Sequence, residues 1–105
     1  MTDQNRIAIL EKYCKEDPTD PFNFYALALE VGKQNAQEAT KILIPLIKSN
    51  PDYLPSYYQA ALFLIRESNY EEASTILEQG IIIARKQNDS KTLRELMSLS
   101  DEMDA

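Results

Sequence analysis

Apolar residues recur at steps of three and four along most of the chain, which is the period of an α-helix. Glycine is almost absent, and β-branched residues do not alternate with polar ones. Proline, asparagine and aspartate interrupt the pattern at regular intervals, as turns do. The pattern predicts about six helices: residues 4–15, 21–32, one that follows residue 35, one around 57–65, one from residue 69 to about 87, and one over 90–103.

Local signals define several helix ends. Asp17-Pro18 ends the first helix, because the residue before a proline is pushed out of the helical region. Asp20 can cap the second helix, and Pro21 suits its first position. Pro45 lies inside the third helix, where it removes one backbone hydrogen bond, so we expect a kink there, with a short break as the alternative. The acidic tail from residue 100 to 105 is expected to fray.

Two stretches of the chain match each other at a nearly constant step. A shift of 33 relates the earlier helix of each pair and a shift of 34 relates the later one. The matched residues are Pro18, Phe24 and Ala28 with Pro51, Tyr57 and Ala61, and Asn35, Glu38, Ala39, Ile42 and Leu43 with Asn69, Glu72, Ala73, Ile76 and Leu77. A regular step of this size indicates stacked copies of one helical unit, which usually presents a surface to other proteins.

The same matches predict how the later helices begin. Asn35 can cap its helix, and Glu38, three residues on, can reach back to it as in a capping box. Asn69 and Glu72 are expected to repeat this arrangement.

The unit of helix, short turn and helix, closed by Asn-Pro or Asp-Pro, resembles the tetratricopeptide repeat. The family marks are small residues at helix crossings, early aromatics and a closing proline; they are matched here by Ala28, Ala61, Ala39, Ala73, Gly80, Phe24, Tyr57, Tyr70 and Pro51. The resemblance implies one all-α domain over residues 1–105, a right-handed superhelix of helical hairpins. It divides into a half repeat (4–17), repeat one (18–50), repeat two (51–87) and a C-terminal capping helix (90–103). Leu46, Ala36 and Arg85 depart from the family pattern.

Composition excludes several functions. The net charge is −6 with no basic stripe, which argues against nucleic acid as a partner. The chain has no histidine and one cysteine, so we expect no metal site, disulfide framework or cofactor. No catalytic constellation is present, and the carboxylate pairs are interpreted as solvated charge, so we expect no enzyme. Cys14 lies on the apolar face of its helix and is expected to be buried.

The start of the chain is polar and no apolar run is long enough to span a bilayer, so the expected location is the cytoplasm. The lone thiol agrees with a reducing compartment.

In the family that the chain resembles, the first helix of each repeat lines a concave groove. The resemblance therefore places one set of side chains on this face: Phe22, Tyr25, Leu29 and Lys33 from one repeat, and Pro55, Tyr58, Leu62 and Arg66 from the next. One subset of the family grips a C-terminal carboxylate here with Lys and Asn; Tyr25, Leu29 and Gln59 stand in those places, which argues against that mode.

The sequence thus predicts a protein-interaction scaffold that binds a peptide or helix of a partner through this aromatic face. There are two alternatives. The last helix covers the face, or the face itself joins two copies of the chain in a homodimer.

Overall fold

The computed structural model describes residues 3–104, which form six helices and no strand. The helices are α1 (Asp3–Glu16), α2 (Pro21–Gly32), α3 (Ala36–Ser49), α4 (Pro55–Arg66), α5 (Tyr70–Lys86) and α6 (Ser90–Asp104). The all-α prediction is confirmed, and the predicted helices match these bounds within one or two residues. The tail predicted to fray is helical as far as Asp104, and Ala105 lies outside the described residues.

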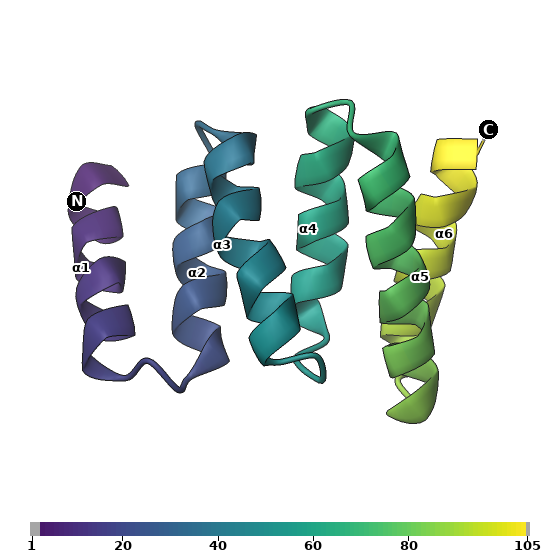
Figure 1. Cartoon of the computed structure of the whole chain (residues 1–105), viewed down its shortest axis with the longest axis horizontal. Helices are drawn as coiled ribbons and strands as arrows, with labels where there is room; N and C mark the ends of the chain where they lie inside the picture. Colours follow the sequence, from purple (N-terminus) through teal and green to yellow (C-terminus); the bar gives the residue numbers. More distant parts are fainter. Residues whose placement is uncertain (1–2, 105) are drawn as a thin grey trace.

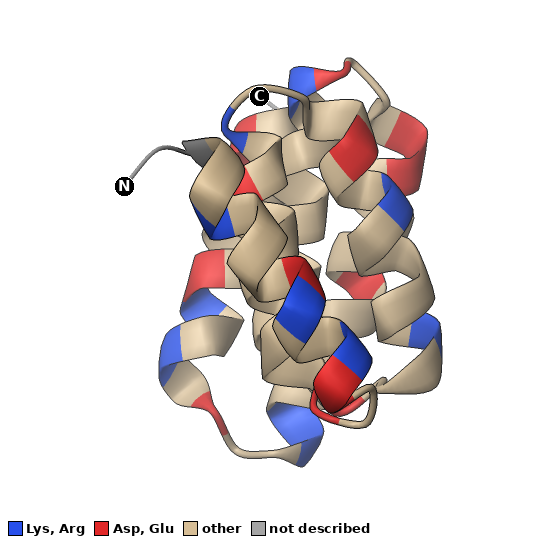
Figure 2. Ribbon diagram, turned by 90° about the vertical axis from the view of Figure 1, so that its left-hand side faces the viewer, with Lys and Arg blue, Asp and Glu red and all other residues tan. Residues whose placement is uncertain are grey.

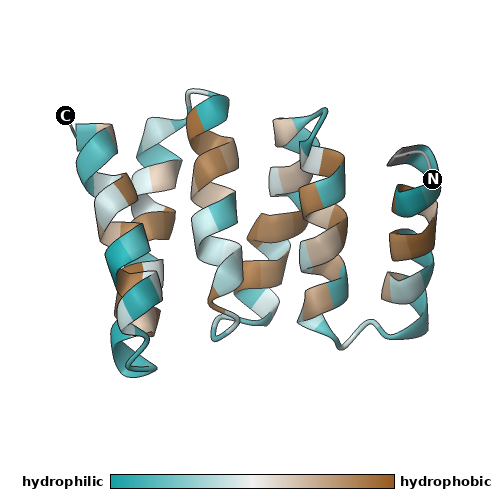
Figure 3. Ribbon diagram, turned by 180° about the vertical axis from the view of Figure 1, so that it is seen from behind, coloured by the Kyte–Doolittle hydropathy of each residue, from teal (hydrophilic) through white to brown (hydrophobic). Residues whose placement is uncertain are grey.

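The helices stand side by side in chain order, each antiparallel to the one before it (Figure 1). Figure 1 looks onto α3 and α5, with α2 and α6 behind them, while α1 and α6 form the two ends of the stack. Figure 2 turns the α1 end toward the viewer. The opposite side, seen in Figure 3, is formed by α2, α4 and α6. Helix α2 contacts both α3 and α4, so the stack has two layers rather than one.

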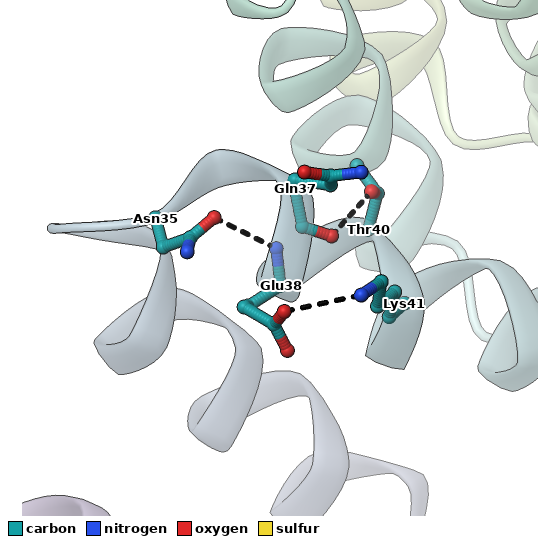
Figure 4. Close-up of polar contacts among 5 residues, drawn as sticks. All are labelled: Asn35, Gln37, Glu38, Thr40 and Lys41. Carbon is teal, nitrogen blue, oxygen red and sulfur yellow. Dashed lines mark hydrogen bonds and ion pairs between the residues drawn. The ribbon is translucent and has the colours of Figure 1, made fainter.

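The start of α3 forms half of the predicted capping box (Figure 4). The side-chain Oδ1 of Asn35 accepts a hydrogen bond from the backbone N–H of Glu38 at 3.1 Å, as predicted. The Glu38 carboxylate does not reach back to Asn35, because it pairs with the Lys41 ammonium at 3.1 Å. The Asp20 cap of α2 is confirmed by the 3.0 Å bond that its Oδ1 accepts from the Phe22 N–H.

The predicted repeat of this box at α5 is wrong. Asn69 makes no side-chain cap; its Nδ2 instead donates to the Glu72 carboxylate at 2.9 Å. A hydrogen bond to a charged acceptor is stronger than one between neutral groups. The Asn69 amide therefore donates to the Glu72 carboxylate, and its oxygen does not accept from the backbone at the start of α5.

Helix α3 continues through Pro45, so the alternative of a break is wrong. Its ribbon changes direction in its second half, in agreement with the expected kink (Figure 1).

Two later turns use left-handed residues that are not glycine. Ser68 and Asn88 have φ of 62° and 56°. In each turn the next residue's N–H returns to the helix just ended, Asn69 to the Leu64 carbonyl at 2.8 Å and Asp89 to the Ala84 carbonyl at 3.0 Å. This arrangement satisfies carbonyl groups that a helix end leaves free.

Small residues allow the helices to approach closely. Six alanines of the described helices are fully buried in the stack: Ala28, Ala39, Ala60, Ala61, Ala73 and Ala84. Gly80 of α5 lies against Tyr57 of α4, whose ring is 2 % exposed and whose hydroxyl donates to the Pro51 carbonyl at 2.6 Å. Cys14 is buried, as expected.

Candidate partner-binding face

The predicted apolar residues belong to α2 and α4, and these helices lie on the near side of the stack in Figure 3. Phe22, Tyr25 and Leu29 follow one another at three- and four-residue steps, so they share one face of α2. Phe22 is 57 % exposed, the largest value among the exposed large hydrophobic residues that the structure describes. Tyr25, Leu29, Tyr58 and Leu62 are each half-buried. The face therefore carries partly exposed apolar area on two neighbouring helices.

Tyr53, which sequence reasoning did not select, partly covers Tyr25. The two rings meet edge to face, with centroids 5.7 Å apart and an angle of 69° between their planes. Burial raises the pKa of both phenols, and the Gln59 side chain, hydrogen-bonded to Tyr25, opposes the rise there. No sequence signal pointed to Tyr53, because it lies in the turn before α4, outside both helical stripes.

Lys33 forms an ion pair with a buried carboxylate at the end of α2. Glu30 is 6 % exposed, and its Oε1 lies 3.1 Å from the Lys33 ammonium and 3.7 Å from Nε of Arg6 on α1. A buried charge is costly unless it is paired, so the two cations make this position of Glu30 possible. The spacing of three between Glu30 and Lys33 is a sequence signal for this pair, but the burial of Glu30 and its contact with Arg6 of α1 are not visible in the sequence.

Arg66 joins α4 to the end of α2. One of its guanidinium N–H groups donates to the Gly32 carbonyl at 3.2 Å, and the guanidinium lies over the Phe63 ring, 5.2 Å from the centroid. A side chain at Gly32 would collide with that ring, since an added Cβ would lie 2.3 Å from it. Arg66 therefore contributes to the stack as well as to the face.

Beyond Tyr58 the face continues into a hollow of about 290 Å³ between α4 and α6. Its lining residues are Tyr58, Lys91, Arg94, Glu95, Ser98, Leu99 and Glu102. Helix α6 thus borders the predicted face without closing over it.

Little in the described part of the chain suggests chemistry. Residues 3–104 contain no group of three or more His, Cys, Asp or Glu side chains that could hold a metal ion. Burial, with a smaller contribution from Glu11, raises the pKa of the Cys14 thiol, which makes its reactive thiolate form scarcer. None of the described helices is both long and apolar enough to cross a membrane.

A stack of antiparallel helix pairs with alanine and glycine at the crossings defines a helical-repeat protein. Comparison with solved structures narrows the class. A crystal structure of a tetratricopeptide repeat domain protein from Salinibacter ruber superposes with a TM-score of 0.76 at 32% identity, over 81% of this chain and 96% of that one. A solution NMR structure, also of a tetratricopeptide repeat domain protein from Salinibacter ruber, gives a TM-score of 0.77 at 34% identity, over 83% and 89% of the two chains.

The chain belongs to the tetratricopeptide repeat family. The resemblance inferred from the repeat step is thereby confirmed. No protein-family model and no curated protein matches the sequence. Membership assigns the chain to a class that generally serves protein–protein interaction rather than catalysis.

Proposed function

We propose that this protein binds a peptide or a helix of a partner protein on the aromatic face of α2 and α4. The exposure of Phe22, 57 % on a helix that otherwise packs into the stack, carries this proposal. Burying a phenylalanine side chain contributes about 1.5–3 kcal/mol to binding, and the half-buried neighbours Tyr25, Leu29, Tyr58 and Leu62 extend the area. Tyrosine suits such a face, because its large apolar ring carries a polar tip.

Lys33 and Arg66 would supply charge at one end of the face. Each has bonds within the chain, to Glu30 and to the Gly32 carbonyl. An ammonium has three donors and a guanidinium five, so both keep donors for a partner group while their positions are fixed. Fixing a side chain before binding lowers the entropy lost on association.

The test compares two single substitutions of similar exposure on opposite sides of the stack. Phe22→Ala removes an apolar ring from the proposed face, and Ile82→Ala removes an exposed side chain (53 %) from α5. Partners captured from native lysate are titrated into each variant and followed by NMR. We expect Phe22→Ala to weaken binding about tenfold or more and Ile82→Ala to leave it unchanged. Chemical-shift changes confined to α3 and α5, with Ile82→Ala as the weakened variant, would reject this face.

The alternative is a homodimer through the same aromatic face. Its motivation is the same partly exposed rings, and light scattering over a range of concentrations separates the two functions. A dimer that Phe22→Ala and Tyr25→Ala dissociate would favour the alternative. The proposed function requires no cofactor and no catalysis; a cytoplasmic location and the division into one half and two whole repeats stay predictions.

A further inference from the structure

Helix α1 carries an apolar stripe that no described helix covers. Ile9 is 37 % and Tyr13 48 % exposed, and their step of four places both on one side of α1. Cys14 is buried on the side that packs against α2. Helix α1 ends the stack in Figure 1, and Figure 2 looks onto this end. Among residues 3–104 the stripe therefore has no helix packed on it.

Helix α3 shows what covers the matching positions. Helices α1 and α3 both have 14 residues, and a shift of 33 relates both of their ends. This shift matches Ile9 with Ile42 and Tyr13 with Leu46. In α3 these two residues face α2: together with Phe24 they line a hollow of about 160 Å³, and Leu46 is buried. Helix α2 thus covers in α3 the positions that α1 leaves open.

Helix α5 repeats this relation. A shift of 34 matches Ile42 with Ile76 and Leu46 with Gly80, and both of the α5 residues are buried. An added Cβ at Gly80 would lie 2.8 Å from Tyr57 of α4, so the preceding helix covers this position too. In α3 and in α5, the positions of the stripe are therefore contacts with the helix before.

Two cations lie at one end of the stripe. The side chains of Arg6 and Lys33 are each 51 % exposed, and they share the single carboxylate of Glu30, which leaves one positive charge in excess. A shift of 33 matches Lys33 with Arg66, which donates to the Gly32 carbonyl at the end of the preceding helix α2. By this relation Arg6 and Lys33 lie where the last carbonyl groups of a covering helix would come, and these groups carry partial negative charge.

The other end of the stripe carries no excess of positive charge. Glu16 is paired with Lys12 at 3.7 Å, and Asp17 follows in the turn. Helical spacing places Glu11 and Lys15 on the far side of α1. A helix is stabilised by cations near its C-terminus, so the charges favour a covering helix that runs parallel to α2, with its C-terminus beside Arg6.

We propose that the α1 end of the stack binds an amphipathic helix of a partner protein, which packs on α1 as α2 packs on α3. Helices α2 and α4 have 12 residues each, and the partner helix needs a similar length. Its apolar side carries an aromatic residue and, four residues later, an alanine, as Phe24 and Ala28 of α2 and Tyr57 and Ala61 of α4 do. The contact continues the packing of the stack, since each later helix of this kind is already covered in the same way.

This surface differs from the aromatic face of α2 and α4, and the two share only Lys33. The proposal therefore does not depend on the proposed function. Ile9→Asp tests the α1 end, and Phe22→Ala tests the aromatic face, so either proposal can fail without the other.

A synthetic peptide with the sequence of residues 18–32 serves as the probe, because this segment contains α2 and covers the matching positions of α3. It is acetylated at its N-terminus, keeps a free C-terminal carboxylate, and is titrated into the ¹⁵N-labelled protein. An isolated helix of this length is marginal in water, so we expect a Kd of roughly 0.1–1 mM, with chemical-shift changes centred on α1. The same peptide with a C-terminal amide should bind severalfold more weakly, because it lacks the negative charge beside Arg6 and Lys33.

Matched substitutions separate the stripe from other exposed surfaces. Ile9→Asp places a charge in the contact and should weaken binding of the peptide about tenfold or more. Ile82→Asp, on an exposed residue of α5, and Phe22→Ala in the protein should leave binding unchanged. A peptide with Phe24→Asp should bind about tenfold or more weakly as well. Ile9 is exposed, so Ile9→Asp should melt near the wild-type temperature, which separates loss of binding from loss of folding.

Three results would overturn the proposal. The first is the absence of shift changes with up to about 2 mM peptide. The second is a set of shift changes on the aromatic face that Phe22→Ala abolishes and Ile9→Asp does not. The third is a wild-type dimer that Ile9→Asp dissociates, which would assign the stripe to a second copy of this chain.

Discussion

Replacing Gly80 by alanine should destabilise the protein, although alanine is the better helix former. Gly80 lies in the interior of α5, where alanine would be favoured by about 1 kcal/mol on helix propensity alone. An added Cβ would lie 2.8 Å from Cβ and 3.0 Å from Cγ of Tyr57, and 3.2 Å from Cδ1 of Leu96. Carbon atoms in ordinary contact are about 3.5–4.0 Å apart, so α4 must shift by a large part of an ångström.

The size of the destabilisation by Gly80→Ala depends on which atoms near position 80 can move away from the added Cβ. Cβ of Tyr57 is fixed by the backbone of α4, and the ring is held by the hydroxyl bond to the Pro51 carbonyl. Neither atom is the free end of a flexible side chain, so the overpacking cost belongs in the upper part of the usual range of about 1–3 kcal/mol. After the propensity gain is subtracted, Gly80→Ala should lower the free energy of unfolding by about 1–2 kcal/mol.

Urea unfolding followed by circular dichroism measures this difference, and the melting temperature should fall by about 5–15 °C. Gln79→Gly and Gln79→Ala form the matched control, because Gln79 is the exposed neighbour of Gly80 in the same helix. There alanine should be more stable than glycine by about 1 kcal/mol. If alanine stabilises both positions equally, the close contact between α4 and α5 is not the reason for glycine at position 80.

Three further outcomes follow from other contacts. Tyr57→Phe loses the hydroxyl bond to the Pro51 carbonyl but keeps the ring, and should lower the free energy of unfolding by about 1 kcal/mol in the same urea assay. Hydrogen bonds from the backbone and side chain of Thr92 lower the pKa of Asp89, so its stabilisation is present above about pH 4 and is lost as the pH falls through the lowered value. Asp89→Ala should therefore melt lower than wild type at pH 7 and converge with it in acid; equal melting at pH 7 would contradict the cap. Cys14 is buried and its pKa is raised, so a thiol reagent should label it far more slowly in the native protein than in urea, and equal rates would show it to be accessible.

Much of the fold could be predicted because its signals are local. Helical spacing of apolar residues, the proline and aspartate at the start of α2 and the asparagine before α3 depend on neighbours within one turn of helix. The repeat step extended these signals to a stack, because matched small residues imply matched crossings. The prediction failed at Asn69, where a segment that shares its asparagine, glutamate and alanine with the one at Asn35 forms a different hydrogen bond. Glu38 pairs with Lys41, whereas Glu72 has the uncharged Thr75 three residues on and accepts a hydrogen bond from Asn69 instead, so the outcome depends on which neighbour the carboxylate binds.

By itself the sequence determined the helices, their order and the resemblance to the family. That the side chains of α2 and α4 around Phe22 and Tyr25 bind a partner stays a prediction. Only the tertiary structure shows which contacts within the chain the residues of this face already make. Lys33 and Arg66 were expected as charges for a partner, yet Glu30 and the Gly32 carbonyl also bind them, and Tyr53 partly covers Tyr25. The Arg66 and Tyr53 contacts join residues far apart in the chain, and the distance between such residues is set by packing rather than by spacing. The Glu30–Lys33 pair is local, at a spacing of three, but the burial of Glu30 and its second cation, Arg6 of α1, come from the tertiary structure.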